Sequence, residues 1–136
     1  GMSHISVIET KIKDLKFLKK ALERLSIEYT ESVGNTTLTL FGYGKDELIQ
    51  VCVMEIKTGC KYSLGLRKVG EHYEFVADWW AIETFTGKKQ DEILNKITRQ
   101  YAYETVLDKI QGLGYSVIDE TEDLQQNVKL TVRRWR

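Results

Sequence analysis

The strongest candidate for chemistry in this 136-residue chain is Asp78, a carboxylic acid inside the string Val-Ala-Asp-Trp-Trp. A carboxyl group enclosed by apolar side chains can serve as a general acid or base. Arg67 lies on the preceding strand-like run, and its guanidinium is suited to holding an anionic ligand. The alternative for Asp78 is structural, because it could hydrogen-bond to Ser63 or cap the segment that follows. An enzyme or small-ligand binder that uses Asp78 and Arg67 is therefore one function that the sequence allows.

Other groups of chemically active residues are excluded by their spacing. His72, Glu74 and Asp78 fall on one face of an extended strand, but positions i, i+2 and i+6 span roughly 20 Å, too far for one metal ion. Cys52 and Cys60 lack the spacing of zinc ligands and fit buried apolar positions. Residues 42–44 (Gly-Tyr-Gly) lack the further glycine and the helix start of a phosphate-binding loop. The sequence therefore predicts no metal site and no cofactor.

Several side chains favour binding over catalysis. Trp80 falls on a polar face of the strand pattern, where packing in the core does not explain an indole. Tyr103 projects from a different side of its helix than Tyr101, so one of the two is expected to be exposed. Glu74 and Arg67 form a charged pair across neighbouring strands. We expect these residues to contribute to a surface that contacts a ligand, a protein partner or a second copy of the chain.

The C-terminal strand offers a different binding surface. Its outward positions are Lys129, Thr131, Arg133 and Trp135, spaced roughly 7 Å apart. This spacing is close to that of phosphates along a nucleic-acid strand, and Trp135 could stack on a base. The formal net charge of zero, with 20 basic and 20 acidic residues, argues against a general nucleic-acid binder. Single-stranded nucleic-acid binding is therefore an alternative that the sequence does not favour.

A β-hairpin over residues 60–80 must position most of these side chains. A two-residue loop at Gly70-Glu71 suits a type II′ turn, because Gly tolerates positive φ at the first position. The register then pairs Val69 with His72, Arg67 with Glu74, Gly65 with Val76 and Ser63 with Asp78. One face becomes apolar and aromatic and the other mostly polar, and a slip by one residue would mix the two sets.

The rest of the chain reads as alternating strands and helices around this hairpin. Asp14 is expected to cap a first helix, and the longest helix is expected over residues 90–113, followed by an acidic loop at 119–123. Residues 47–56 are apolar at both odd and even positions, so both faces of an extended strand would be apolar. This pattern predicts a central strand that is covered on both faces. Further strands are expected at residues 4–10, 27–32, 36–41, 115–118 and 128–135, with 27–32 and 36–41 forming a hairpin. The fold class is α+β, a mainly antiparallel sheet of seven or eight strands with two helices packed on one face.

Composition sets broad limits on the class of protein. A length of 136 residues, with 42% hydrophobic and 29% charged residues, fits a single soluble domain over residues 1–136, with Gly1 read as an expression scar. Two cysteines make no disulfide framework, and no apolar run is long enough to span a membrane. We expect a cytoplasmic protein, or its equivalent in the plastid stroma, that does not enter a membrane.

The chain also resembles a known family. The resemblance is carried by the string Tyr-Glu-Phe-Val-Ala-Asp-Trp-Trp at residues 73–80 and by Gln-Tyr-Ala-Tyr at 100–103. The opening Met-Ser-His and the closing Val-Arg-Arg-Trp agree with it. These features resemble small uncharacterised proteins of cyanobacteria and plastid genomes, known as hypothetical chloroplast open reading frame thirty-five, a domain of unknown function. Ala81 departs from the glycine expected after the tryptophan pair, which leaves the local turn open.

The resemblance implies a soluble stromal or bacterial protein and brings no activity with it. Because no catalytic or metal motif stands out, the sequence favours a protein-interaction or assembly module, with a homodimer as one form, over an enzyme.

Overall fold

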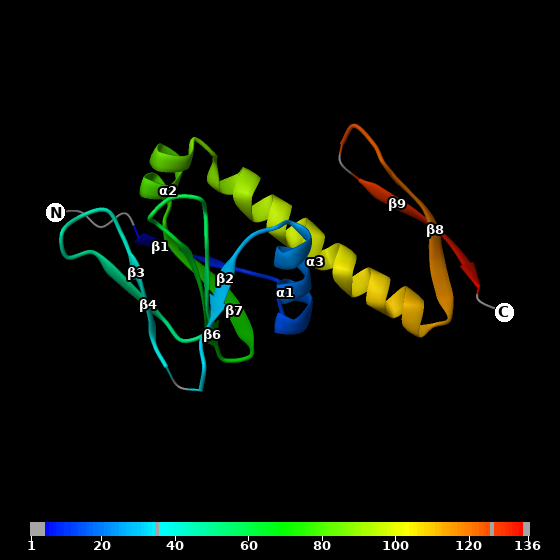
Figure 1. Ribbon diagram of the computed structural model, residues 1–136, viewed down its shortest axis with the longest axis horizontal. Helices are drawn as coiled ribbons and strands as arrows, with labels where there is room; N and C mark the ends of the chain where they lie inside the picture. The colour runs from blue at the N-terminus through cyan, green and yellow to red at the C-terminus, as the bar shows by residue number, and fades with distance from the viewer. Residues whose placement is uncertain (1–4, 35, 126, 135–136) are drawn as a thin grey trace. The chain divides into compact units, whose positions relative to one another are not determined.

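The computed structural model describes residues 5–34, 36–125 and 127–134 (Figure 1). The chain forms two compact units, Gly1–Tyr101 and Ala102–Arg136, and helix α3 (Gln90–Gly112) passes from the first to the second. A single domain over residues 1–136 stays a prediction.

The described residues contain three helices and nine strands, which confirms the α+β class. The elements of the first unit, besides α3, are β1 (Ile5–Glu9), α1 (Leu15–Arg24), β2 (Tyr29–Glu31), β3 (Leu38–Phe41), β4 (Leu48–Val51), β5 (Met54–Ile56), β6 (Leu64–Val69), β7 (His72–Asp78) and α2 (Trp79–Thr86). The second unit adds β8 (Tyr115–Glu122) and β9 (Val128–Arg134). All strand pairs are antiparallel, as predicted. They form a five-stranded sheet of order β1-β7-β6-β5-β2 and two hairpins, β3–β4 and β8–β9, rather than one sheet of seven or eight strands.

The central hairpin β6–β7 has the predicted register. Val69 pairs with His72 and Gly65 with Val76. Gly70 has a φ of 61°, and Glu71 is not among the residues with positive φ, which fits a type II′ turn. The turn and the alternating apolar face act together, so local chemistry and burial specify one pairing.

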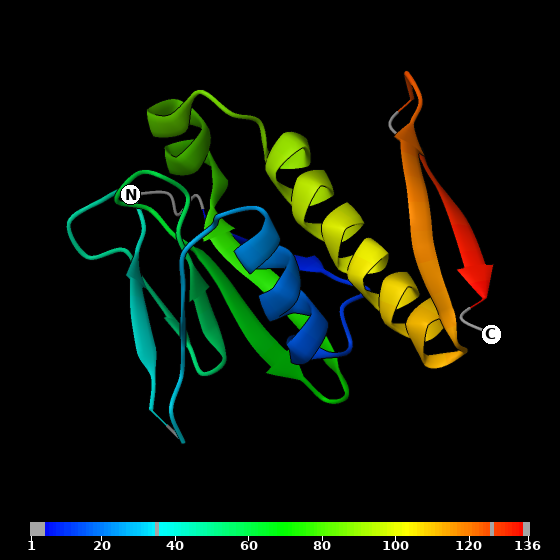
Figure 2. The ribbon, with the colours of Figure 1, turned by 45° about the vertical axis from the view of Figure 1, so that its right-hand side comes forward.

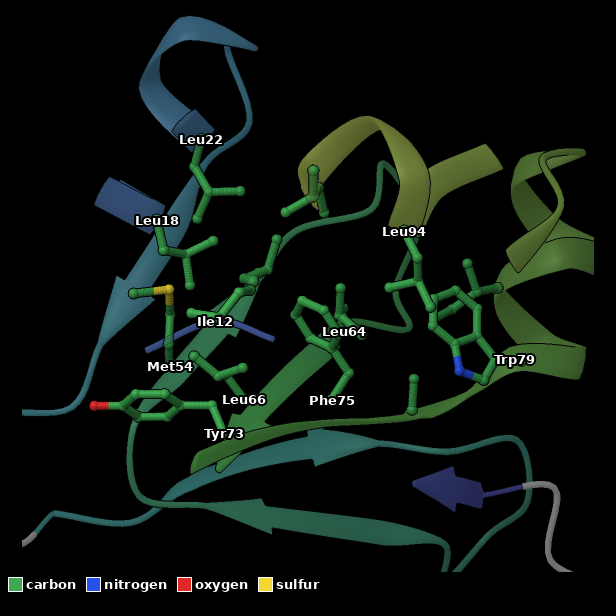
Figure 3. Close-up of a cluster of buried hydrophobic side chains, with 14 residues drawn as sticks. Ile12, Leu18, Leu22, Met54, Leu64, Leu66, Tyr73, Phe75, Trp79 and Leu94 are labelled. Carbon is green, nitrogen blue, oxygen red and sulfur yellow. The ribbon is translucent and has the colours of Figure 1, made fainter. Parts of the chain in front are cut away.

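Two helices cover one face of the five-stranded sheet, as predicted. Figure 2 shows α1 and the first half of α3 lying across this face. Leu18 and Leu22 from α1, with Leu94 from α3, meet the aromatic and aliphatic side chains of β6 and β7 (Figure 3). Asp14 caps α1 by accepting a hydrogen bond from the backbone N–H of Lys16 at 2.9 Å.

The opposite face of β6 and β7 is only partly polar. Val76 packs against Leu40 and Val51 from the β3–β4 hairpin and forms a second buried cluster. Gly65 makes this close approach possible, because an added Cβ would lie 2.8 Å from Val51 Cγ1. The expectation of a mostly polar face is therefore wrong at the end of the hairpin that contains Asp78, where β3–β4 covers the face. It holds at the end that contains Arg67, where the face is uncovered.

One predicted strand pairing and one predicted continuous strand are wrong. β2 pairs with β5 and β3 pairs with β4, so the expected hairpin of residues 27–32 with 36–41 does not form. The expected continuous strand at 47–56 breaks at Cys52-Val53, and its two halves join different sheets. β4 buries Ile49 and Val51 in the second cluster, and β5 buries Met54 and Ile56 in the main core. The buried set therefore changes from odd-numbered to even-numbered residues at the break, while Leu48 and Cys52 are exposed.

The second unit differs from expectation mainly at its acidic segment. Asp119, Glu120 and Glu122 belong to β8, which is longer than predicted. Asp123 organises the turn to β9, since its Oδ1 accepts the backbone N–H groups of Gln125 and Asn127 at 2.9 and 2.8 Å. Backbone hydrogen bonds from Asn127 hold the pKa of Asp123 below its ordinary value.

Candidate functional site

An exposed group of four aromatic rings lies around α2. We call it the aromatic cluster; its members are Tyr43, Tyr62, Trp80 and Phe85. The ring centroids of Tyr43 and Trp80 are 4.8 Å apart in an edge-to-face arrangement, and those of Tyr62 and Phe85 are 5.4 Å apart. Tyr43 also lies 6.4 Å from Tyr62 and 6.1 Å from Phe85. These separations are typical of attractive aromatic pairs, so the four rings form one surface.

The cluster remains open to solvent although its rings touch. Tyr43, Trp80 and Phe85 keep 47%, 44% and 54% of their surface exposed. Trp79, the preceding residue, is buried in the core. The first turn of α2 therefore directs one indole inward and the next one outward, which agrees with the prediction that Trp80 lies on the surface.

Phe41 is a further exposed ring, two residues before Tyr43 in the chain. It is also about half exposed, and the Nζ atom of Lys61 lies 4.9 Å from its ring centroid. Lys61 precedes Tyr62 of the cluster in the chain. Phe41 and Lys61 thus bring an aromatic face and a cation together.

Asp78 is buried beneath the cluster and holds two of its backbone segments in place. Its Oδ1 accepts the backbone N–H of Ala81 at 3.0 Å and caps α2. Its Oδ2 accepts the backbone N–H of Tyr43 at 2.7 Å. One carboxylate thus ties the start of α2, which carries Trp80, to the loop that carries Tyr43.

The loop at residues 42–47 is held tightly against Asp78. The N–H of Gly42 donates to the carbonyl of Glu47 at 2.8 Å. A Cβ added to Gly42 would lie 3.1 Å from Glu47 Cβ and 3.4 Å from Asp78 Oδ2. A glycine at this position therefore lets the loop approach the carboxylate and present Tyr43.

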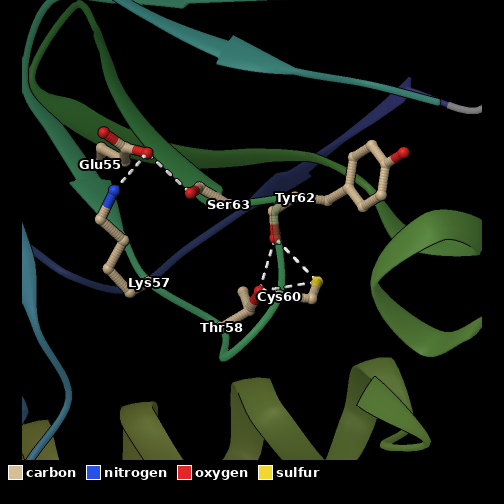
Figure 4. Close-up of polar contacts among 6 residues, drawn as sticks. All are labelled: Glu55, Lys57, Thr58, Cys60, Tyr62 and Ser63. Atoms are coloured by element: carbon tan, nitrogen blue, oxygen red, sulfur yellow. Dashed lines mark hydrogen bonds and ion pairs between the residues drawn. The ribbon is translucent and has the colours of Figure 1, made fainter. Parts of the chain in front are cut away.

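The loop at residues 57–63 presents Tyr62 (Figure 4). The hydroxyl of Thr58 donates to the carbonyl of Tyr62 at 2.5 Å, and the Cys60 thiol donates to the same carbonyl at 3.5 Å. The Tyr62 side chain extends from this loop toward α2, where it meets Phe85. Two side chain-to-backbone contacts thus fix the backbone that carries this ring.

Glu55 anchors the other side of the same loop. Its Oε2 accepts hydrogen bonds from Ser63 Oγ at 2.7 Å and from Lys57 Nζ at 3.0 Å. Burial tends to raise the pKa of Glu55, but the hydrogen bonds and the charge of Lys57 outweigh this effect and lower the pKa. Ser63 is therefore a partner of Glu55 and not of Asp78.

A cavity of about 420 Å³ opens beside this loop, within the first unit. Its floor is apolar and includes Ile56, Leu64 and Ile97, and its rim carries Lys57, Lys88 and Lys96 together with Glu28 and Glu92. The volume suits a small organic molecule. Neither Arg67 nor Asp78 lines the cavity.

The proposed catalytic pair does not share a site. Arg67 pairs with Glu74, as predicted, at 3.1 Å. Asp78 lies four residues beyond Glu74 on β7, roughly 13 Å along the strand. Both Asp78 oxygens accept backbone N–H groups, and the side chain is buried. A role for Asp78 in acid–base chemistry stays a prediction, and the structure places it as the cap of α2.

His72 and Glu74 meet a third potential metal ligand that sequence spacing could not reveal. Glu9 lies opposite Glu74 in the β1–β7 register. One ligand atom from each of the three residues lies within 4.8 Å of the others. Asp78, the third member considered from the sequence, is not part of this group.

The remaining predicted binding residues lie in the second unit. Tyr103 donates its hydroxyl to Glu120 Oε2 at 3.0 Å. Arg133 is exposed and lies opposite Ser116 in the β8–β9 register, whereas Thr131 lies opposite Asp119. Trp135 lies outside the described residues. Nucleic-acid binding through this strand stays a prediction.

Tyr43, Tyr62 and Phe85 were not predicted as site residues. Tyr43 and Tyr62 come from loops that are distant from Trp80 in the sequence, and the sequence pattern did not indicate a helix at residues 79–86. These residues form α2. Asp78 at the N-cap and Gly87 at the C-terminal end, where φ is 75°, delimit this helix. A capping residue followed nine positions later by glycine was the available signal. Ala81, which departs from the glycine expected there, is a buried helical residue that donates to Asp78.

Comparisons with known proteins agree with the resemblance seen in the sequence. The chain is 33% identical to the uncharacterized protein ycf35 of Guillardia theta, and the match covers 99% of both chains. It is 29% identical to ycf35 of Cyanophora paradoxa over 99% of both chains, and 26% identical to that of Pyropia yezoensis over 98% of both. No solved structure gives a significant match.

Two further observations bear on the class of protein. Among the described residues, no helix has the length and apolar character needed to cross a membrane. Residues 21–131 match the family described as "Protein of unknown function (DUF1257)". The chain is thus similar to the plastid ycf35 proteins, and it belongs to the DUF1257 family of proteins of unknown function.

Proposed function

We propose that the aromatic cluster is a docking site for a short segment of a partner protein, so that the chain acts as a protein-interaction module. The supporting observation is the exposure of three neighbouring rings, Tyr43, Trp80 and Phe85, of which Tyr43 packs against the other two. Contiguous exposed aromatic groups are typical of surfaces that bind another molecule.

The size of the surface favours a peptide segment over a second copy of the chain. Three members of the cluster, Tyr43, Trp80 and Phe85, are each about half exposed. An aromatic residue can bury 150–250 Å², so these side chains offer about 300 Å² in total. A stable protein–protein interface of standard size needs about 800 Å² per partner. The surface is large enough for a few anchor side chains of an extended segment.

The chemistry of the cluster indicates which anchors would fit. Tilted rings around Tyr43 form an uneven apolar surface that can hold proline or aliphatic side chains. The hydroxyl groups of Tyr43 and Tyr62 can orient a polar backbone. Lys61 at the edge favours an acidic residue beside the apolar anchors.

Peptide display tests this proposal directly. A library of random linear peptides is selected on the full-length protein, and enriched sequences are measured by fluorescence anisotropy. We expect a consensus with apolar anchors whose affinity falls at least about tenfold in Trp80→Ala and in Phe85→Ser, because aromatic anchors dominate such contacts. Val33→Ser is the matched control, since Val33 is exposed but is not part of the cluster.

Two outcomes would contradict the proposal. Peptides that bind the two cluster variants as well as the wild type would place the binding elsewhere. A stable dimer in sedimentation that becomes monomeric in Phe85→Ser, without any peptide consensus, would make the cluster an interface between two copies.

A further inference from the structure

The uncovered part of the polar sheet face contains a second feature. Glu9 on β1 and Glu74 on β7 are direct cross-strand neighbours, and His72 lies two residues from Glu74 on the same face. Like charges directly opposite each other on a sheet repel. The two carboxylates are therefore placed where a positive charge between them would be stabilising.

The atoms of this group are close to a metal-binding arrangement. His72 Nε2 lies 3.6 Å from Glu9 Oε1, and the three ligand atoms lie within 4.8 Å of one another. Around a zinc ion with ligand bonds of about 2.1 Å, neighbouring donor atoms in a tetrahedral shell lie about 3.4 Å apart. The Glu9 side chain is 78% exposed, so a change of rotamer can bring its oxygen closer without disturbing the core.

Arg67 supports the group from the next strand. Its Nε and Nη2 atoms both contact Oε1 of Glu74 at 3.1 Å. These contacts orient the carboxylate and are compatible with metal binding through its other oxygen, since carboxylate ligands are commonly held by such outer hydrogen bonds. The Arg67 guanidinium also offsets the negative charge of one of the two carboxylates. Without a metal ion, the repulsion between Glu9 and Glu74 therefore does not destabilise the sheet strongly.

We propose that Glu9, His72 and Glu74 form a surface site for a divalent first-row transition metal ion, with water molecules completing its shell. One imidazole nitrogen and two carboxylate oxygens suit zinc or manganese. They suit magnesium less well, because magnesium prefers oxygen ligands alone. The residues lie on two hydrogen-bonded strands, so their backbones are already fixed in register.

Calorimetric titration of the full-length, chelator-treated protein with Zn²⁺, Mn²⁺ and Mg²⁺ tests the site. We expect one Zn²⁺ or Mn²⁺ per chain, weaker Mg²⁺ binding, and a loss of at least about tenfold in affinity for both His72→Ala and Glu9→Gln. Glu71→Gln is the matched control, because it removes the same charge one residue from His72 but in the turn. His4→Ala and a variant without cysteines show whether the other histidine or the thiols bind the ion.

A second readout separates site binding from loss of structure. Mn²⁺ should broaden the nuclear magnetic resonance signals of residues near β1 and β7 in the wild type and not in Glu9→Gln, while circular dichroism stays unchanged. Absence of binding in the wild type overturns the proposal. Binding that persists in both ligand variants, or that vanishes in His4→Ala, overturns it as well.

Discussion

Asp78 is a candidate acid–base residue in the sequence, and in the structure it links two segments by accepting a hydrogen bond from each. An aspartate among tryptophans has the composition of an acid–base site. It also has the composition of an N-cap that begins an apolar helix. The structure adds the second acceptor contact, to the N–H of Tyr43, which no local pattern contains. The apolar neighbours of Asp78 drew attention to it in the sequence, but the position of its partner in a distant loop could not be predicted.

Replacement of Asp78 by alanine should weaken the fold. Loss of a helix cap costs about 0.5–2 kcal/mol, and a buried N–H without an acceptor costs about 1–3 kcal/mol. We expect Asp78→Ala to lower the free energy of unfolding by about 2–4 kcal/mol in urea denaturation. Asp78→Asn should cost less, because an amide keeps one acceptor oxygen. Wild-type stability in Asp78→Ala would contradict this linking role.

Ser26 is the one residue other than glycine with positive φ, at 56°, among the described residues. It follows α1 in a Schellman motif, in which Ser26 N–H donates to Glu23 and Ile27 N–H donates to Leu22. Ser26→Gly should raise the free energy of unfolding by about 1 kcal/mol, because the left-handed conformation costs about that much with a Cβ. Ser26→Ala also removes the hydroxyl but keeps the Cβ, so thermal denaturation should show no gain.

Glu55 should make stability depend on pH. Its pKa lies below its ordinary value of 4.5, so its contribution is present above that value and is lost as the pH falls through the folded-state pKa. We expect Glu55→Gln to be less stable than the wild type at neutral pH and the difference to shrink well below pH 4.5. Urea denaturation at both pH values measures this. A difference of equal size at both would show that the carboxylate charge is not involved.

At the level of elements, the sequence was informative where neighbours in the chain are neighbours in space. The Gly70 turn and the Asp14 cap were predicted because a few adjacent residues specify them. The pairing of β2 with β5, in contrast, joins segments separated by another hairpin, and nothing in the residues of β2 identifies its partner. The break at Cys52-Val53 was hidden because the two halves bury opposite alternate residues, and their combined pattern looks apolar throughout.

The packing of β3–β4 on the main sheet depends on Gly65. A methyl group there would lie 2.8 Å from Val51, 3.1 Å from Val76 and 3.2 Å from Leu40. Gly65→Ala should therefore lower the free energy of unfolding by about 1–3 kcal/mol, the usual cost of overpacking. Gly112→Ala in α3 is the control, because an added Cβ there meets no atom within 4 Å. Equal stability of the two variants in urea would show that the hairpin can move aside.

At the scale of the whole molecule, the hydrophobic core belongs to one part of the chain. Every buried apolar side chain among the described residues lies within Gly1–Tyr101. The β8–β9 hairpin is two-stranded, and such hairpins are marginally stable by themselves. The sequence pattern predicted its strands but not the uneven distribution of burial.

Removal of residues 115–136 should leave the core intact. We expect the shortened chain to unfold cooperatively in urea, with a midpoint close to that of the full chain, because no buried apolar contact is removed. Near-ultraviolet circular dichroism should retain the signal of the buried Trp79. Broad, non-cooperative unfolding would show that the hairpin is required for the fold.

The loop at residues 57–63 belongs to two surfaces at once. Lys57 and Thr58 line the cavity, Tyr62 belongs to the aromatic cluster, and the hydroxyl of Thr58 binds the Tyr62 carbonyl. Because the Thr58 hydroxyl holds the Tyr62 carbonyl, a molecule that displaces Thr58 when it enters the cavity also displaces Tyr62. Thermodynamic reciprocity then requires that a cavity ligand and a docked peptide change each other's affinity by the same factor. The loop thereby couples the occupancy of the cavity to the occupancy of the aromatic cluster.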